Sequence, residues 1–250
     1  MKTDELERYA RHIVLREIGG TGQQKLRNAR VLVIGAGGLG SPVLMYLAAA
    51  GVGVMGVVDD DIVSLSNLQR QVLHSTESVG MPKVTSAVEA IARINPHVTI
   101  EPHQIRITAE NAVDIVTNYD LVMDGSDNFD TRYLINEVCV NLNKPLISAA
   151  MSQWEGQISL YDPTNGGPCY ACVFPQRPAD GLAPSCAEAG VMGALAGVMG
   201  SMMAGEAIKN ITGAGEGLRG QMLIFDALYG ETRKFKLTAN TDCPICSHLS

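Results

Sequence analysis

A glycine-rich segment near the N-terminus is the first candidate for chemistry. Gly35, Gly37, Gly38 and Gly40 lie in the string GAGGLG, directly after the apolar run 30–34 and before a helical pattern. Glycines let the backbone turn tightly and approach a phosphate, and the free N–H groups at the start of the next helix attract its charge. The GxGxxG spacing therefore predicts a nucleotide site.

An acidic residue supports this interpretation. Asp59 closes the next apolar run, nineteen residues after Gly40. A carboxylate at this distance accepts hydrogen bonds from ribose hydroxyls. The glycine turn and Asp59 together indicate a nucleotide but do not identify which one. NAD is the default interpretation. The other alternative, a turn that only packs a helix on a strand, is disfavoured by the order of strand, helix and acid.

Three charged residues downstream favour ATP over NAD. The cations Arg70 and Lys83 could converge on a triphosphate and stabilise the charge that develops on leaving pyrophosphate. Asp127 follows a strand end, where a carboxylate can hold a Mg²⁺ ion that bridges phosphates. Taken singly, each residue has an ordinary alternative. Arg70 could be a surface cation, Lys83 a charge on a helix face and Asp127 a helix N-cap.

Four cysteines form two CxxC pairs, Cys169 with Cys172 and Cys243 with Cys246. Four thiolates grouped in this way suit tetrahedral Zn²⁺, and four protein ligands leave no open position for a substrate. We therefore predict a structural zinc site that fastens the C-terminal segment to a distant loop. Unligated or redox-active thiols are the alternative. Cys139 lies on an apolar helix face and is expected to be a buried thiol.

The elements that must position these residues alternate between strands and helices. We predict strands over 30–34, 54–59, 98–103, 121–124, 145–149, 155–161, 221–225 and 232–237. We predict helices over 39–50, 82–94, 110–117, 128–142 and 191–205. The βαβ alternation of the first half requires a parallel sheet covered on both faces. The fold class is thus α/β, Rossmann-like, with a mixed sheet whose later strands are antiparallel.

Composition limits the classes of partner. The 250 residues carry a net charge of −7, and no block of Lys or Arg is present, which argues against a nucleic-acid surface. The apolar stretch 191–205 is shorter than the roughly 20 residues that span a bilayer, so we predict a buried helix. The N-terminus shows the spacing of an amphipathic helix and no signal peptide, so a soluble, cytoplasmic protein is expected.

The string SLSNLQRQ at 64–71, the glycine turn and the triplet Ser126-Asp127-Asn128 together resemble the MoeB/ThiF (HesA/MoeB/ThiF) family, relatives of the ubiquitin-activating enzymes. The similarity runs from Arg8 to the last cysteine pair. It implies an adenylyltransferase that uses ATP and Mg²⁺ to activate the C-terminal glycine carboxylate of a ubiquitin-like sulfur carrier, MoaD- or ThiS-like, with release of pyrophosphate. It also supports zinc at the four cysteines.

The resemblance implies a set of nucleotide-binding residues: Gly35, Gly37, Gly38, Gly40, Asp59, Asp61, Ser66, Asn67, Leu68, Gln69, Arg70, Lys83, Asp127 and Asn128. Arg11 resembles an arginine that reaches into the active site of a neighbouring subunit, which implies a homodimer. Cys186 precedes a helix whose dipole would stabilise a thiolate, and a covalent role and a bystander thiol stay open for it.

The predicted organisation is one domain over 1–250, with an N-terminal helical arm (1–28), a nucleotide-binding half (29–150) and a carrier-binding and zinc half (151–250). Because the chain ends just after the second CxxC pair, sulfur is expected from a separate sulfurtransferase or cysteine desulfurase. Molybdopterin and thiamine synthesis fit equally well. Three rival functions are an NAD-dependent oxidoreductase, a non-catalytic scaffold and an enzyme that activates a different carboxylate.

Overall fold

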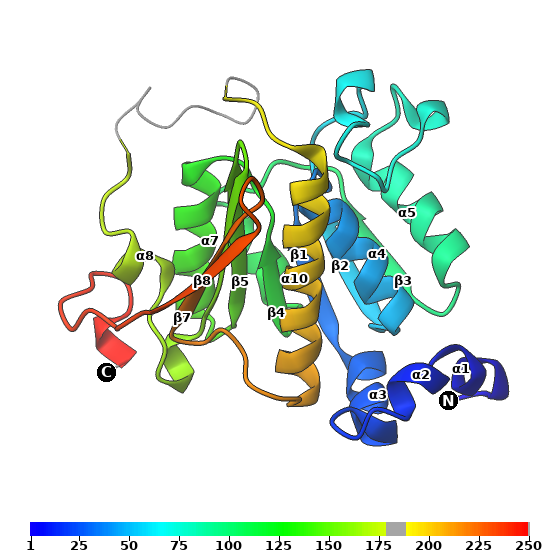
Figure 1. Cartoon of the computed structure of the whole chain (residues 1–250), viewed down its shortest axis with the longest axis horizontal. Coiled ribbons are helices and arrows are strands. Elements are labelled where there is room, and N and C mark those ends of the chain that lie inside the picture. The colour runs from blue at the N-terminus through cyan, green and yellow to red at the C-terminus, as the bar shows by residue number, and fades with distance from the viewer. Residues whose placement is uncertain (179–188, 250) are drawn as a thin grey trace.

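One mixed β-sheet runs through the computed structural model, which describes residues 1–178 and 189–249 (Figure 1). Its eight strands have the order β3-β2-β1-β4-β5-β6-β7-β8. The strands are β1 (Arg30–Ile34), β2 (Val54–Val58), β3 (Thr99–His103), β4 (Leu121–Asp124), β5 (Leu146–Ser152), β6 (Glu155–Tyr161), β7 (Gln221–Asp226) and β8 (Glu231–Lys236). The predicted α/β fold with a mixed sheet is confirmed.

The direction of the strands changes at β5. Strands β1 to β5 pair in parallel, and helices connect most of them along the chain. Strands β5 and β6 are antiparallel, since only Gln153 and Trp154 separate them, and such a short connection cannot return a parallel strand. Gln153 takes a positive φ of 51° in this turn. Strands β7 and β8 continue the antiparallel part.

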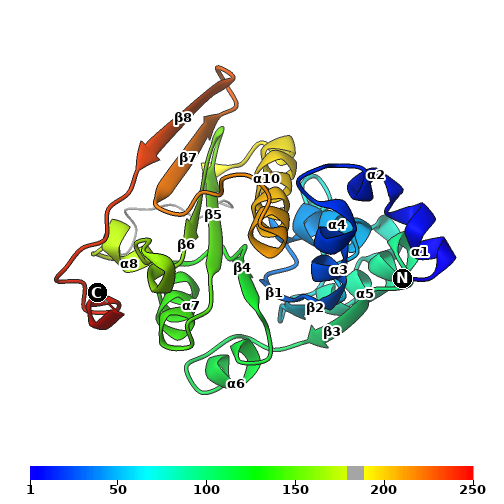
Figure 2. The ribbon, with the colours of Figure 1, turned by 90° about the horizontal axis from the view of Figure 1, so that it is seen from below.

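Helices cover both faces of the sheet (Figure 2). They are α1 (Thr3–Arg8), α2 (Ala10–Ile13), α3 (Gly19–Asn28), α4 (Gly40–Ala50), α5 (Lys83–Ile94), α6 (Ala112–Val116), α7 (Phe129–Asn141), α8 (Tyr170–Val173) and α10 (Gly193–Thr212). Apolar residues of α4, α5 and α10 form the core on one face, and those of α6, α7 and α8 form the core on the other. The carboxyl ends of the parallel strands therefore lie between two layers of packed helices.

Helix α10 lies close against α4 because small residues occupy the contact. A Cβ atom on Gly200 would stand 2.3 Å from Cγ of Pro42 and 2.5 Å from the carbonyl oxygen of Leu39. The helix continues past the predicted end at residue 205 to Thr212, where Gly213 caps it with a φ of +83°. Glu206 pairs with Lys209 and accepts a hydrogen bond from the N–H of Leu218 (2.8 Å). No helix in the described parts of the chain is long and apolar enough to cross a membrane.

The N-terminal amphipathic helix is divided where the prediction expected continuity. Tyr9 separates α1 from α2, and its side chain is buried. Its ring lies over Gly51, where any Cβ atom would stand 2.5 Å from Cζ of Tyr9. The hydroxyl accepts a hydrogen bond from Nδ2 of Asn95 (2.8 Å). Burying this ring decides the break, and the third helix of the arm, α3, then leads into β1.

Candidate active site

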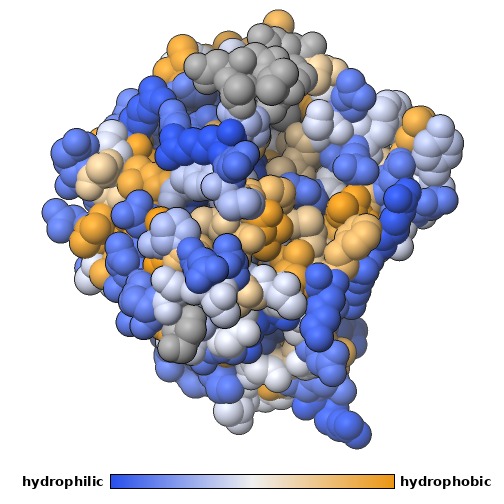
Figure 3. Space-filling view, turned by 90° about the vertical axis from the view of Figure 1, so that its left-hand side faces the viewer, coloured by the Kyte–Doolittle hydropathy of each residue, from blue (hydrophilic) through white to orange (hydrophobic). Residues whose placement is uncertain are grey.

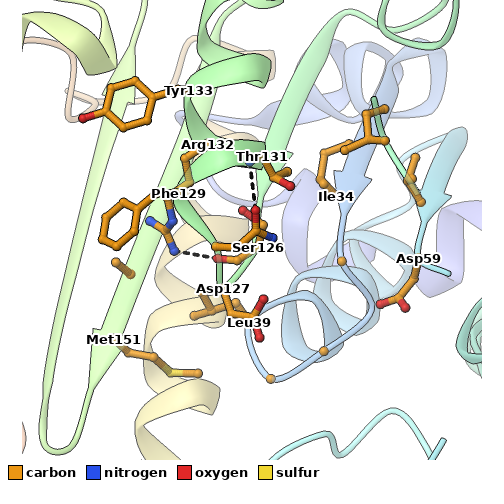
Figure 4. A pocket seen from close by; sticks show the side chains of 18 of the residues that line it. Ile34, Leu39, Asp59, Ser126, Asp127, Phe129, Thr131, Arg132, Tyr133 and Met151 are labelled. Carbon is orange, nitrogen blue, oxygen red and sulfur yellow. Dashed lines mark hydrogen bonds between the residues drawn. The ribbon is translucent and has the colours of Figure 1, made fainter. Parts of the chain in front are cut away.

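A cavity of about 1230 Å³ opens at the carboxyl ends of β1, β2 and β4 (Figure 4). In an open parallel sheet this is the edge where ligands bind, since the loops there leave a crevice. Predicted site residues contribute to its wall: Gly35, Gly37, Gly38, Asp59, Asp61, Arg70, Lys83, Asp127 and Asn128. The fold thus brings together residues that are widely separated in sequence.

The glycine turn forms one wall and depends on missing side chains. Gly35 has a φ of +89°, which favours glycine. A Cβ atom on Gly40 would stand only 1.8 Å from the carbonyl oxygen of Gly35. Gly40 does not line the cavity. Because it has no side chain, the start of α4 can lie close against the turn. At Gly38 a Cβ atom would crowd Met151 and Ala196 (3.1 and 3.3 Å), so a side chain at this position would displace its neighbours.

Asp59 lies at the end of β2 and joins it to the glycine turn. Its carboxylate accepts hydrogen bonds from the N–H groups of Ala36 (2.8 Å) and Asp61 (2.9 Å). Burial raises the pKa of Asp59, while the nearby ammonium of Lys83 and both hydrogen bonds act in the opposite direction. The two hydrogen bonds leave acceptor capacity on the carboxylate for ribose hydroxyls.

Two cations reach the cavity from different elements. Lys83, the first residue of α5, is buried, and its Nζ lies 2.8 Å from Oδ2 of Asp61 and 3.9 Å from Oδ1 of Asp59. Arg70 is half-buried next to Gly38 and donates a hydrogen bond from Nη1 to the carbonyl oxygen of Ser66 (3.2 Å). Both can supply positive charge beside the glycine turn.

Asp127 and Asn128 have separate tasks at the start of α7. Asn128 is the N-cap, because its Oδ1 accepts a hydrogen bond from the N–H of Thr131 (2.9 Å). Asp127 is exposed to the cavity, and its carboxylate has no hydrogen bond or ion pair within residues 1–178 and 189–249. The ordinary alternative for Asp127, an N-cap, is therefore wrong, and its carboxylate is available to a cation.

Other predicted residues lie outside the cavity wall. Ser66 and Asn67 belong to a short 3₁₀ helix, Leu65–Asn67, and Leu68 and Gln69 follow it. Asn67 accepts a hydrogen bond from the N–H of Ser64 (3.2 Å) and so fixes the loop that delivers Arg70. Arg11 is exposed on α2, at the end of the molecule that carries the N-terminal helices (Figure 1). Cys186 lies outside the described residues.

His74 is a structural residue of this site that sequence reasoning left without a role. It is buried, with Nε2 2.9 Å from the carbonyl oxygen of Ala36 and Nδ1 2.8 Å from the hydroxyl of Ser86. Because a carbonyl can only accept, Nε2 carries the proton, and Nδ1 accepts from Ser86. The neutral imidazole therefore connects the glycine turn to α5, the helix that begins with Lys83. No spacing in the sequence signals this role.

The four cysteines of the CxxC pairs meet beside α8. Their sulfur atoms all lie within 4.8 Å of one another, with Cys169 3.7 Å from Cys243 and Cys172 3.4 Å from Cys246. Asn136 of α7 donates a hydrogen bond from Nδ2 to the sulfur of Cys169 (3.7 Å). Such a group of thiol ligands can hold a metal ion. The remaining described cysteine, Cys139, is buried as predicted.

A family model for the ThiF family matches residues 9–245. The chain belongs to the ThiF family. It is 50% identical over 247 residues to a sulfur carrier protein adenylyltransferase of Thermus thermophilus, covering 97% of this chain and 91% of the relative. It is 46% identical over 242 residues to a SAMP-activating enzyme E1 of Haloferax volcanii, covering 97% and 89%.

Another ThiF-family relative is longer than this chain. It is a probable adenylyltransferase/sulfurtransferase MoeZ of Mycobacterium tuberculosis, 46% identical over 252 residues, and the chain covers 64% of its length. Among solved structures, Escherichia coli MccB with ATP matches with a TM-score of 0.84 and 24% identity, covering 96% of this chain and 73% of that one. That structural match supports the fold.

Proposed function

We propose that this chain is an adenylyltransferase that uses ATP and Mg²⁺ to activate the C-terminal glycine carboxylate of a ubiquitin-like sulfur carrier, MoaD- or ThiS-like. One observation carries the proposal: the glycine turn, Arg70, Lys83 and Asp127 line a single cavity. The identity to the Thermus thermophilus enzyme over nearly the whole chain supports the same conclusion. An NAD-dependent oxidoreductase would have no use for this group of charges.

ATP is seated with its phosphates over the glycine turn and its ribose on Asp59. The backbone N–H groups of the turn and the start of α4 favour negative charge there. The carboxylate of Asp61 is exposed, so water screens its ion pair with Lys83. When the triphosphate arrives, Lys83 can exchange that carboxylate for a phosphate oxygen. Arg70, in the loop after the 3₁₀ helix Leu65–Asn67, lies next to Gly38.

The carrier's carboxylate attacks the α-phosphate of ATP. A bond forms between a carboxylate oxygen and phosphorus, the bond to the β-phosphate oxygen breaks, and pyrophosphate leaves with that electron pair. The carboxylate is already ionised at neutral pH, so the step needs no general base. The protein contributes positioning and neutralisation of charge, with Arg70 and Lys83 on the phosphates and Mg²⁺ on Asp127. The product is an acyl-adenylate, ready for later thiocarboxylation.

A second copy of the chain completes the site in this proposal. Arg11 is exposed on α2 and does not line the cavity of its own chain. We therefore assign it to the cavity of the second subunit of a homodimer, where it adds positive charge near the phosphates. Cys186 is assigned no part in adenylation, because attack on the α-phosphate requires no thiol.

Cys169, Cys172, Cys243 and Cys246 would hold Zn²⁺ in a structural role. Because all four ligands would come from the protein, the ion would cross-link the segment after β8 to α8 and take no part in the reaction. The chain is divided between a helical arm (1–28), a nucleotide-binding half (29–150) and a half that binds the carrier and zinc (151–250). Sulfur is delivered to the adenylate by a separate sulfurtransferase or cysteine desulfurase.

The test is ATP–pyrophosphate exchange with the purified chain, Mg²⁺ and radiolabelled pyrophosphate. One carrier of the molybdopterin pathway and one of the thiamine pathway, each ending in Gly-Gly, are added separately. Exchange that depends on a carrier supports the proposal and indicates the pathway. ATP binding without exchange on either carrier would contradict the carrier assignment, and the absence of ATP binding would contradict the nucleotide site.

A further inference from the structure

A buried arginine of α7 lies in the wall of the same cavity. Arg132, in the first turn of α7, is only 7% exposed and lines the cavity. Its Nη2 donates a hydrogen bond to the carbonyl oxygen of Ser126 (2.6 Å), drawn as a dashed line in Figure 4. Its side chain also forms a hydrogen bond with the side chain of Tyr170. A guanidinium has five N–H donors, so these two bonds leave donors for a further acceptor.

Arg132 has no paired carboxylate in the described parts of the chain, residues 1–178 and 189–249. Asp124 is a buried acid of the same region, but its oxygens accept hydrogen bonds from the N–H and hydroxyl of Ser126 and the hydroxyl of Ser148. A buried cation without a close counter-ion is costly. An anion that enters the cavity would remove that cost.

The surroundings of Arg132 differ from the nucleotide part of the cavity. Aromatic side chains line this part of the wall: Phe129, Tyr133, Tyr170 and Phe174. Figure 4 shows Arg132 and Phe129 on one side of Asp127 and Asp59 on the other. Apolar walls lower the local dielectric constant, so a guanidinium attracts an anion more strongly there than in water. An anion at Arg132 would therefore be bound against aromatic side chains.

The outer surface on this side is suited to a protein ligand. Figure 3 shows the side of the molecule that carries α8 and β8, with apolar side chains gathered near the middle of a largely hydrophilic face. Tyr133 donates its hydroxyl hydrogen bond to the carbonyl oxygen of Phe174 (2.7 Å), so its ring is fixed as part of the wall. Tyr133 and Phe174 thus form a fixed part of the cavity wall to which Arg132 belongs.

We propose that Arg132 binds the free carboxylate at the C-terminus of the carrier before adenylation; this inference rests on the proposed function. A guanidinium and a carboxylate fit through two parallel hydrogen bonds. A carboxylate held in this way keeps lone pairs for attack on the α-phosphate beyond Asp127. Arg132 is thus the residue that distinguishes a chain end from an internal peptide bond, which carries no charge.

The test compares two forms of one carrier, with a C-terminal Gly-Gly carboxylate or the corresponding carboxamide. Calorimetry gives the Kd of each form for the full chain. The wild-type chain should bind the carboxylate form at least about tenfold more tightly, as expected for charged hydrogen bonds. Arg132→Gln should bind both forms within about twofold of each other and should keep the wild-type Kd for ATP. Arg106→Gln, which changes an exposed arginine of the same cavity, should keep the discrimination.

Each other outcome overturns a defined statement. Equal discrimination by wild type and Arg132→Gln would overturn the inference, as would a weaker Kd for ATP with discrimination unchanged, since the anion would then be a phosphate. Equal binding of both carrier forms by wild type would overturn the inference and leave the proposed function intact. Binding of neither form would overturn both. Circular dichroism and Arg132→Lys, which keeps the charge, separate loss of the anion site from loss of folding.

Discussion

Nε2 of His74 donates a hydrogen bond to the carbonyl oxygen of Ala36, the residue between the first two glycines of the turn, across 2.9 Å. The same residue donates its own N–H to Asp59 (2.8 Å). Ala36 is therefore held on both sides, by a strand end through Asp59 and by α5 through His74 and Ser86. The shape of the turn therefore depends in part on His74 and Ser86, which do not line the cavity.

Replacing His74 should weaken ATP binding more than it slows catalysis. His74→Ala leaves the buried carbonyl of Ala36 without its donor, which should raise the KM for ATP about tenfold and lower the free energy of unfolding by about 2 kcal/mol. Ser86→Ala removes only the second bond and should have a smaller effect. Steady-state kinetics with urea unfolding checks both variants. An unchanged KM in His74→Ala would contradict a positioning role.

The same histidine should make stability fall in mild acid. Burial lowers the pKa of His74; Lys83 acts in the same direction, and Asp59 opposes it. As the pH falls through the usual histidine range near 6.5, His74 becomes protonated in the unfolded chain while it stays neutral in the folded chain. The free energy of unfolding therefore decreases. Urea titrations between pH 7.5 and 5.5 should show a shallower decline for His74→Gln than for wild type.

Asp127→Ala should abolish carrier-dependent pyrophosphate exchange, with a loss of at least about a hundredfold, because it removes the carboxylate assigned to Mg²⁺ beside the phosphates. Cys186→Ala should leave the exchange intact. The two variants together separate phosphoryl chemistry from thiol chemistry. Loss of exchange in Cys186→Ala would show that the division of roles is wrong.

Gly40→Ala should disrupt the nucleotide site through the backbone. The added Cβ would overlap the carbonyl oxygen of Gly35 at 1.8 Å, so the turn or α4 must move, at a cost of several kcal/mol. Gly205→Ala is the matched control, a helical glycine of α10 with nothing within 4 Å of its Cβ position. That change should stabilise the chain by up to about 1 kcal/mol. Thermal unfolding and ATP titration distinguish the two.

Cys172→Ser should remove the metal and lower the melting temperature. Losing one of four ligands weakens a closed site strongly, and the binding free energy of a structural metal is also folding free energy. Metal analysis should give one ion per wild-type chain and almost none in the variant. Cys139→Ala, which changes a buried thiol outside the cluster, should keep the metal. Retained metal in Cys172→Ser would exclude this cysteine as a ligand.

Apolar patterning allowed much of the fold to be predicted. The strands β1, β4 and β6 have the predicted bounds, because each is a short run ended by polar residues or glycine. The division of the N-terminal helix could not be predicted, since it depends on Tyr9 reaching Gly51 and Asn95 through space. The C-terminal end of α10 lies beyond the apolar stretch, at Thr212, because Gly213 takes the left-handed conformation that ends a helix.

The residues of the candidate site that belong to a sequence motif could be predicted. Those whose role depends on packing in the folded chain could not. The glycine turn, Asp59 and Asp127 stand at strand ends, and strand ends meet at one edge of the sheet. Residues 66–69 belong to the same string as Arg70 but lie outside the cavity wall, and Asn67 fixes the loop that carries Arg70. Arg132 and His74 are single polar residues on helical or loop segments, and their importance comes from burial, which a sequence does not display.

The cysteine cluster also makes the order of folding measurable. Cys169 and Cys243 are separated by 74 positions, and α10 and the last two strands lie between them. Contacts between such distant segments form late, after the chain between them has ordered. High-affinity metal uptake during refolding should therefore lag behind the formation of the parallel half. A chromophoric chelator that competes for the ion would then report, in real time, the moment at which the C-terminal segment docks.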